Sequence, residues 1–315
     1  MTYLGECYCE ENAKQPLQEV DSLMFQRPLI CTDLADGLQR LVKFVPSLVA
    51  GGMTDIVFLH IVPFREDANI PKADLEKIDR AQNLLSTALK QVPEGATVKV
   101  EVQSGRPLDV ILKMVTTHQS DVLILGTESR NLLTEKLFGS TTTELSQRSP
   151  IPLLTLRPQL ISTYTSEELE LRCRHLFRYL LLPYDDSSPS KQVIERIKHC
   201  AKNQSDRAIK GVILCWVVEE GGRRELTLEQ QQKVVCDTLE PVRDDLATYG
   251  LEVTLDVRRG NSIAQVLAAA QESEASAIGL STGNIGKLLN WSVPSFTGEM
   301  LRRSWHPVLF FPPKR

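Results

Sequence analysis

Several features of membrane, secreted and nucleic-acid-binding proteins are missing from this 315-residue sequence. No apolar run approaches the ~18 residues that a membrane-spanning helix needs, and no basic segment followed by an apolar one marks a secretory leader at Met1. The seven cysteines are odd in number and lack the spacing of a disulfide framework. The formal net charge of −4 favours neither nucleic acid nor an anionic membrane surface as a partner. We therefore expect a cytoplasmic protein that does not insert into membranes.

Signatures of metal binding and catalysis are missing as well. The five histidines show no metal-ligand spacing, and Cys7 and Cys9 form a lone Cys-x-Cys pair with no nearby histidine or second pair. There is no Gly-Lys-Ser/Thr phosphate loop and no Ser-Gly-Gly-x-Asp adenylation loop. No Ser/His/Asp or Cys/His set can be nominated from spacing. The sequence thus predicts no resident metal and no catalytic residues.

What the sequence does contain is an alternation of short apolar runs and amphipathic helical patterns. Helices are predicted over Leu34–Ala50, Ala73–Gln91 and Leu108–His118, and a fourth begins near Thr141. This order indicates a parallel sheet with helices on both faces. The predicted strands are Pro28–Asp33, Asp55–Val62, Thr97–Val102, Val122–Leu125 and Ile151–Leu156.

The same pattern recurs about 155 residues later, which indicates a duplicated domain and not a short-period solenoid. The predicted fold is α/β, with two tandem Rossmann-like domains that each contain a five-stranded parallel sheet. We expect a tail over residues 1–24, a domain over 25–158, a linker over 159–176 with a short helix from about Ser166, and a domain over 177–315. The strands of the second copy are Leu180–Asp185, Gly211–Val218, Leu251–Val257, Ala275–Leu280 and Pro307–Phe311.

The candidate site lies in the loop that follows the fourth strand of the first copy. Gly126 lets the chain turn sharply off the strand and lets a ligand approach the backbone. Gly139 and Ser140 precede a helix N-terminus, where unpaired N–H groups and the helix dipole favour an anion such as phosphate. Thr141 adds a hydroxyl and has the capping-box spacing to Glu144. Any strand–helix crossover also needs a glycine turn and a capped helix, so this loop alone leaves both interpretations open.

The loop resembles the nucleotide-binding loop of the universal stress protein family: Gly, two residues, Gly, nine residues, Gly-Ser/Thr. Here Gly126, Ser129, Gly139 and Ser140 occupy those positions, so serine replaces the second glycine. The resemblance covers nearly all of residues 28–311, and its fold is that of the adenine nucleotide alpha hydrolase-like proteins.

The resemblance implies an adenine nucleotide, ATP, ADP or AMP with or without Mg²⁺, as the ligand. In that family the aspartate that ends the first strand contacts adenosine, a backbone position at the end of the second strand contacts adenine, and the glycine loop holds ribose and phosphates. In this sequence the aspartate is Asp33 and the backbone position is Val62. Asp33 could instead cap the helix that follows it.

In the second copy the aspartate is kept as Asp185, but the loop differs. Ser281 and Ser295 stand at the positions of Gly126 and Ser140, and Pro294 stands at the position of Gly139. Proline has no N–H to donate to a phosphate and fixes φ. The second site is therefore predicted to be degenerate.

Three functions from different classes fit these features. The first is a regulatory module for stress response or signalling, which binds a nucleotide in its first domain and acts through an unidentified protein partner. The second is a scaffold that binds no nucleotide, and the third is an enzyme, which the missing motifs disfavour beyond slow incidental ATP hydrolysis. The resemblance also implies that the two copies pair within the chain through their last strands, while a homodimer of the whole chain stays open.

Overall fold

The computed structural model describes residues 25–35, 37–64, 73–126, 140–202, 209–219, 228–281 and 296–312. The predicted tail with Cys7 and Cys9 lies outside these ranges, and so do Ser129, Gly139 and Ser295.

The first half contains five strands connected by helices, as predicted. Its helices are the 3-10 helix η1 (Leu38–Lys43), α1 (Val45–Ala50), α2 (Leu75–Leu85), the 3-10 helix η2 (Ser86–Leu89), α3 (Pro107–Thr117) and α4 (Ser140–Arg148). Its strands are β1 (Pro28–Cys31), β2 (Asp55–Val62), β3 (Thr97–Ser104), β4 (Val122–Gly126) and β5 (Leu153–Leu156).

The predicted single helix over Leu34–Ala50 is wrong. The chain forms η1 and α1 instead, because Gly37 begins η1 with a left-handed φ of 83° and Pro46 occupies the first turn of α1. Proline has no N–H with which to continue a hydrogen-bond ladder from a preceding turn, so a helix tends to begin there. The apolar pattern did identify the buried side of this segment, since Leu38, Leu41 and Leu48 are all buried.

The second half repeats this order with small differences. Its helices are α7 (Ser188–Lys202), α8 (Leu228–Thr248), α9 (Ser262–Glu272) and α10 (Phe296–Arg303). Its strands are β6 (Tyr179–Pro183), β7 (Gly211–Val218), β8 (Glu252–Arg259), β9 (Ala277–Ser281) and β10 (Val308–Phe311).

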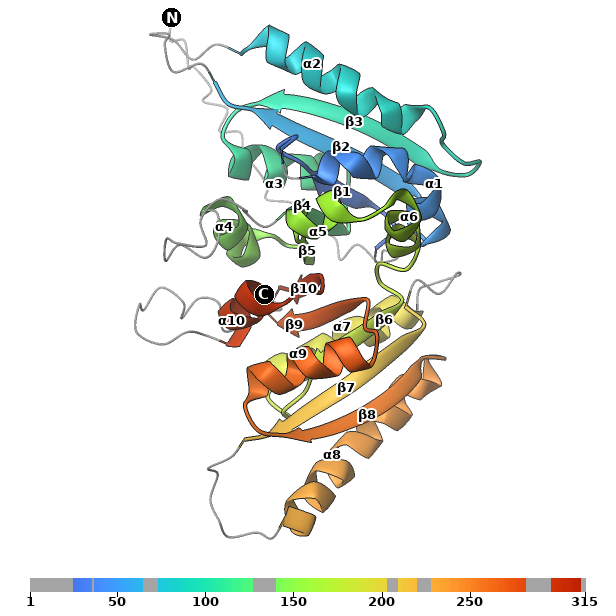
Figure 1. Cartoon of the computed structure of the whole chain (residues 1–315), viewed down its shortest axis with the longest axis vertical. Helices are drawn as coiled ribbons and strands as arrows, with labels where there is room; N and C mark the ends of the chain where they lie inside the picture. Colours follow the sequence, from blue (N-terminus) through green and yellow to red (C-terminus); the bar gives the residue numbers. More distant parts are fainter. Residues whose placement is uncertain are drawn as a thin grey trace, which may run out of the picture.

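All ten strands belong to one sheet, in the order β3-β2-β1-β4-β5-β10-β9-β6-β7-β8. Pairing is parallel within each half, and β5 pairs with β10 in antiparallel register, Leu154 opposite Leu309. The predicted α/β fold is confirmed, and so is the pairing of the two copies through their last strands. The outer strands β3 and β8 lie at opposite ends of the molecule, with β5 and β10 between them (Figure 1).

Backbone conformation shows the duplication independently of side chains. Left-handed φ angles occur at positions about 155 residues apart, where tight turns enter or leave equivalent elements. The pairs are Gly95 and Gly250, Gly105 and Gly260, and Gln119 and Glu274.

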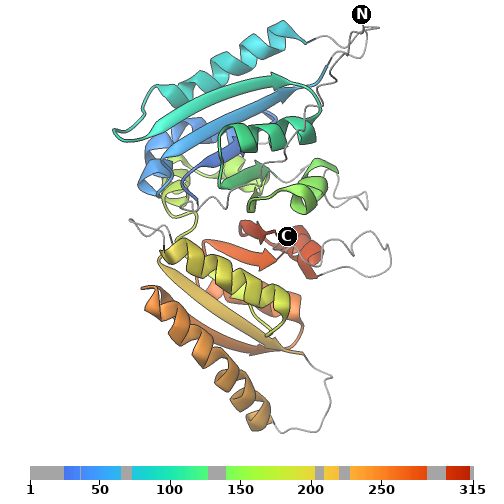
Figure 2. The ribbon, with the colours of Figure 1, turned by 180° about the vertical axis from the view of Figure 1, so that it is seen from behind.

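Two apolar cores lie on opposite faces of the sheet, because successive strand residues point to opposite sides. Leu29 of β1 belongs to the core beneath α3, α4, α9 and α10, and Ile30 belongs to the other core. Helices cover both faces in each half (Figure 2). Each core includes residues of both halves, so burial is continuous across the junction between β5 and β10.

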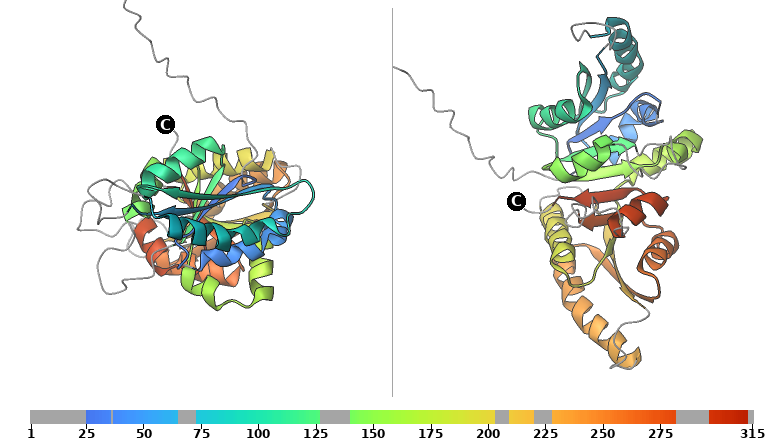
Figure 3. Two further views of the ribbon diagram at one scale, coloured as in Figure 1. Left: turned by 90° about the horizontal axis from the view of Figure 1, so that it is seen from above. Right: turned by 90° about the vertical axis from the view of Figure 1, so that its left-hand side faces the viewer.

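The predicted linker is more ordered than expected. It contains α5 (Pro158–Thr163), which the sequence did not predict, and α6 (Ser166–Arg174), which starts at the predicted residue. A capping box between Thr165 and Glu168 begins α6. Both helices pack beside the junction of the halves (Figure 3), and Arg40 of η1 donates hydrogen bonds to the carbonyls of Ile161 and Tyr164.

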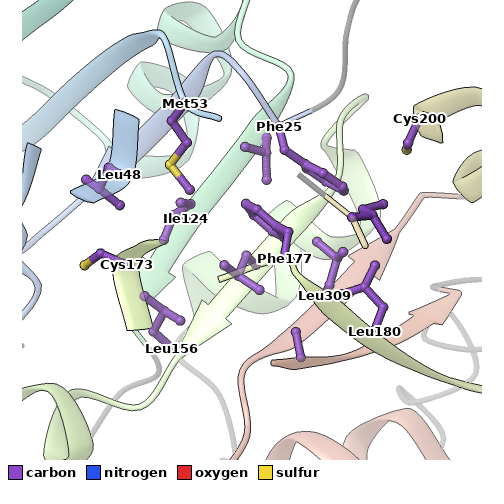
Figure 4. Close-up of a cluster of buried hydrophobic side chains, with 14 of the residues drawn as sticks. Phe25, Leu48, Met53, Ile124, Leu156, Cys173, Phe177, Leu180, Cys200 and Leu309 are labelled. Carbon is purple, nitrogen blue, oxygen red and sulfur yellow. The ribbon is translucent and has the colours of Figure 1, made fainter. Parts of the chain in front are cut away.

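An aromatic pair joins the two halves beneath the sheet. Phe25 and Phe177 each precede the first strand of their half, and their rings stack with centroids 4.2 Å apart and an interplanar angle of 9°. Both side chains are buried, and Ile124, Leu156 and Leu309 lie around them (Figure 4).

Candidate functional site

The strand order places the predicted site at the switch point of the first half. The chain runs from β1 through β2 to β3 on one side and then crosses back to place β4 on the other side of β1. In parallel sheets of this kind, ligands bind beyond the carboxyl ends of the two strands that flank the switch point. Asp33 follows β1 and Gly126 ends β4, so the structure brings these two predicted residues to the same edge.

Asp33 lies on a tight turn and is exposed. Its Oδ1 accepts a hydrogen bond from the N–H of Ala35 at 2.8 Å, and the next residue, Leu34, has a left-handed φ of 64°. A leucine rarely adopts this conformation, and the N–H of Leu34 is held by Thr32 Oγ1 at 3.0 Å. The first residue of η1 follows Gly37, so Asp33 does not cap that helix, and the turn fixes its carboxylate beyond the sheet edge.

The end of β2 lies on the same edge and is tied to its neighbours. Val62 is buried, and its carbonyl accepts a hydrogen bond from the N–H of Gly105 at 3.4 Å. His60 Nδ1 lies 2.8 Å from the carbonyl oxygen of Thr32, which fixes the end of β2 against the turn after β1. Val62 can therefore offer a ligand only backbone groups and apolar surface.

The helix start predicted near Thr141 is confirmed to within one residue. Because α4 begins at Ser140, Thr141 lies inside its first turn and the predicted capping box with Glu144 is wrong. Leu145 of α4 is fully buried in the core beneath α3 and α4, which fixes the helix against the sheet. The first turn of α4 can thus present N–H groups to an anion.

Comparison with known proteins shows which proteins this chain is similar to. The sequence profile of the universal stress protein family matches residues 24–157. A universal stress protein of Mycobacterium tuberculosis, Rv2319c, is 26% identical over 232 residues, which cover 71% of this chain and 75% of that protein. The first half of the chain, residues 24–157, therefore matches the universal stress protein family, and the chain as a whole is similar to its members.

Solved structures show that the fold extends over both halves. The crystal structure of a universal stress protein from Archaeoglobus fulgidus superposes with a TM-score of 0.61 at 18% identity, and covers 92% of this chain and 98% of that one. PA1789 of Pseudomonas aeruginosa, described as functionally unknown, superposes with a TM-score of 0.54 at 16% identity, over 91% and 92% of the two chains. At this identity the likeness establishes the fold and nothing about ligands.

The second half of the chain repeats the aspartate turn. Asp185 is exposed, its Oδ1 accepts a hydrogen bond from the N–H of Ser187 at 3.1 Å, and Asp186 has a φ of 60°. Ser281 ends β9 as Gly126 ends β4. The backbone of the two edges is therefore alike, and the halves differ in side chains.

Aromatic side chains distinguish the second edge. Tyr184 and Trp216 stand where the first half has Thr32 and His60, with ring centroids 6.1 Å apart. The Tyr184 hydroxyl donates to Asp186 Oδ1 at 3.0 Å. Burial, together with this hydrogen bond, raises the pKa of Tyr184 to about 12. Both rings are larger than the threonine and histidine side chains at the equivalent positions.

One further residue at the first edge was not predicted. The hydroxyl of Ser104, at the end of β3 beside Val62, is buried and has no hydrogen-bond partner within the described part of the chain. A buried hydroxyl without a partner costs about 1–3 kcal/mol, so a ligand that hydrogen-bonds it would gain by doing so. A serine at a strand end is common, and nothing in the sequence distinguishes this one.

Across the described ranges, no three His, Cys, Asp or Glu side chains are grouped as a metal site would require. None of the helices in that part of the chain combines the length and the apolar composition needed to cross a bilayer.

Proposed function

We propose that the first half binds an adenine nucleotide, ATP, ADP or AMP with or without Mg²⁺, at the carboxyl edge of β1 and β4. The observation that carries the proposal is the turn after β1, which holds the exposed Asp33 carboxylate beside the switch point, next to Gly126. In this assignment Asp33 contacts the adenosine part, the Val62 backbone contacts adenine, and the glycine loop with the start of α4 holds the ribose and the phosphates. The loop residues are Gly126, Ser129, Gly139, Ser140 and Thr141.

The second half is proposed to have lost this ability. Asp185 keeps its turn, but Tyr184 and Trp216 occupy the strand ends, and Pro294 cannot donate an N–H where the first half has Gly139. Ser281 and Ser295 are then remnants of the loop positions.

The role that fits these features is regulatory, in a stress response or in signalling, with a protein partner and a cytoplasmic location. A bound nucleotide would favour one conformation of the glycine loop, and a partner that recognises this conformation would bind more tightly. Any hydrolysis of ATP would be slow and incidental. The alternative is a scaffold that binds no nucleotide. Ser129 favours this alternative, because the family motif has a glycine at that position.

The proposal is tested by calorimetric titration of the purified chain with ATP, ADP and AMP. At least one of them should bind with a Kd below about 1 mM. Gly139→Val should abolish binding, because a branched side chain at that position would lie where the phosphates approach the backbone. Gly283→Val, in the corresponding loop of the second half, is the control and should bind as the unchanged chain does.

Both variants should unfold thermally within a few degrees of the unchanged protein. Failure of the unchanged chain to bind any of the three nucleotides at about 1 mM would favour the scaffold. Equal binding by the Gly139→Val variant would place the nucleotide elsewhere.

A further inference from the structure

A pocket of about 340 Å³ lies where the linker helices cover the junction between the halves. Its floor is apolar and includes Ile124 of β4, Leu156 of β5 and Cys173 of α6, all buried. The second half contributes Trp305 and Pro307 to the opposite wall. None of the residues assigned to the nucleotide lines this pocket, so it is a separate feature.

Two guanidinium groups stand on the rim, each against an aromatic ring. The Arg172 guanidinium carbon lies 4.2 Å from the ring centroid of Tyr164, and that of Arg157 lies 5.0 Å from the ring centroid of Trp305. Neither arginine forms an ion pair within the described ranges, so neither charge is neutralised there by a carboxylate. Trp305 is 62% exposed, unusually open for a tryptophan.

The arginines differ in their other contacts. Arg157 also holds the end of α10, donating to the carbonyls of Leu301 at 3.0 Å and of Ser304. The Arg172 guanidinium instead packs on the ring of Tyr164. Arg157 is thus structural as well, and Arg172 is the residue to change in a test.

The rim carries charges of both signs, two arginines and two glutamates. The pKa of His306 is lowered, first by burial and then by the nearby charge of Arg172, which places the Arg172 charge close to this wall. Two carboxylates also reach the wall. Glu168 is held by the N–H of Thr165 at 2.8 Å, and Glu274 is exposed to solvent.

We propose that this pocket binds a small organic anion with an apolar body, such as an alkyl or aryl carboxylate. The apolar floor would bury the body of the molecule, and the Arg172 guanidinium beside the aromatic rings would meet its charged group. The pocket volume lies at the lower end of the range for small-molecule sites. Because both halves and the linker form its walls, a bound molecule would hold the junction together.

The probe for this site is octanoate, with octylamine as the matched cation of the same chain length. Calorimetry should show one octanoate bound per chain and no binding of octylamine, and octanoate should raise the unfolding temperature. Saturating ATP should leave octanoate binding unchanged, which separates this site from the proposed nucleotide site.

The decisive variants lie on one helix. Arg172→Glu should weaken octanoate binding at least about tenfold, because it replaces the attracting charge by a repelling one. Arg174→Glu, also on α6 but outside the pocket, should bind as the unchanged chain does. Arg172→Gln, which removes the charge without reversing it, should also weaken binding. Equal binding of octanoate and octylamine, equal affinity in the Arg172 and Arg174 variants, or no octanoate binding at about 10 mM would overturn the proposal.

Discussion

Phe177→Ala is expected to lower the free energy of unfolding by about 3–5 kcal/mol, the usual cost of removing a buried phenyl ring. Phe177 is 2% exposed and stacks on Phe25 of the other half, so the substitution removes apolar burial and leaves a cavity that Phe25 faces. Because both cores continue across the junction, the loss should affect the whole chain and not one half alone. Urea unfolding followed by circular dichroism measures it.

A double-mutant cycle tests whether the two rings act on each other. Phe25→Ala should cost less in the Phe177→Ala background than in the unchanged protein, with a coupling of about 0.5–3 kcal/mol. Phe64→Ala is the control, since that side chain is 42% exposed and its loss should change stability by no more than about 0.5 kcal/mol. Additive losses at positions 25 and 177 would show that the halves do not support each other through this contact.

Asp121→Asn is expected to abolish the loss of stability that Asp121 causes in the unchanged protein as the pH rises from about 4 to about 7. Asp121 is 4% exposed at the start of β4, and burial raises its pKa from 3.8 to about 6. The N–H groups of Gln26 at 3.0 Å and Arg27 at 2.9 Å, with the Arg27 guanidinium at 3.8 Å, oppose this shift without cancelling it.

The sign follows from the direction of the shift. The folded protein holds the Asp121 proton more tightly than the unfolded chain does, so this stabilisation is complete below about pH 4 and is lost as the pH rises through about 6. A shift from 3.8 to about 6 corresponds to about 3 kcal/mol. Above about pH 7 the contribution of Asp121 no longer changes.

Thermal unfolding of both proteins between pH 4 and pH 8 provides the measurement. The asparagine leaves one backbone N–H without an acceptor, which lowers stability by about 1–3 kcal/mol at every pH. The two proteins are therefore compared by how steeply the stability of each changes with pH. The variant should lose less stability than the unchanged protein between pH 4 and 6. Parallel curves would show that Asp121 does not titrate in this range.

Most of the fold could be predicted from the sequence, because buried parallel strands are continuous apolar runs bounded by glycine, proline and polar turn residues. β2 and β7 have the predicted bounds, and β5 pairs with β10 as the family resemblance implied. The break between η1 and α1 was missed, because the helical spacing of apolar residues continues past Pro46. α5 was missed because its six residues carry too little periodicity to distinguish a helix from a linker.

The candidate site was predictable only in part. The positions of Asp33, Val62 and Gly126 at one edge follow from strand polarity, and the structure brings their backbones together. Features that depend on three-dimensional contact were not predictable: the left-handed Leu34, the unpaired hydroxyl of Ser104 and the stacking of Phe25 on Phe177. Ser129, Gly139 and Ser295 lie outside the described residues, and their roles stay predictions.

The central claim, one working nucleotide site in a chain with two similar halves, is tested most directly by native mass spectrometry with ATP, ADP or AMP. Asp33 and Asp185 lie on equivalent turns and are both exposed, so alanine at each removes the same contact from one half. We predict one nucleotide per chain, lost in Asp33→Ala and retained in Asp185→Ala. Two nucleotides per chain, or a loss in Asp185→Ala with binding kept in Asp33→Ala, would contradict this account.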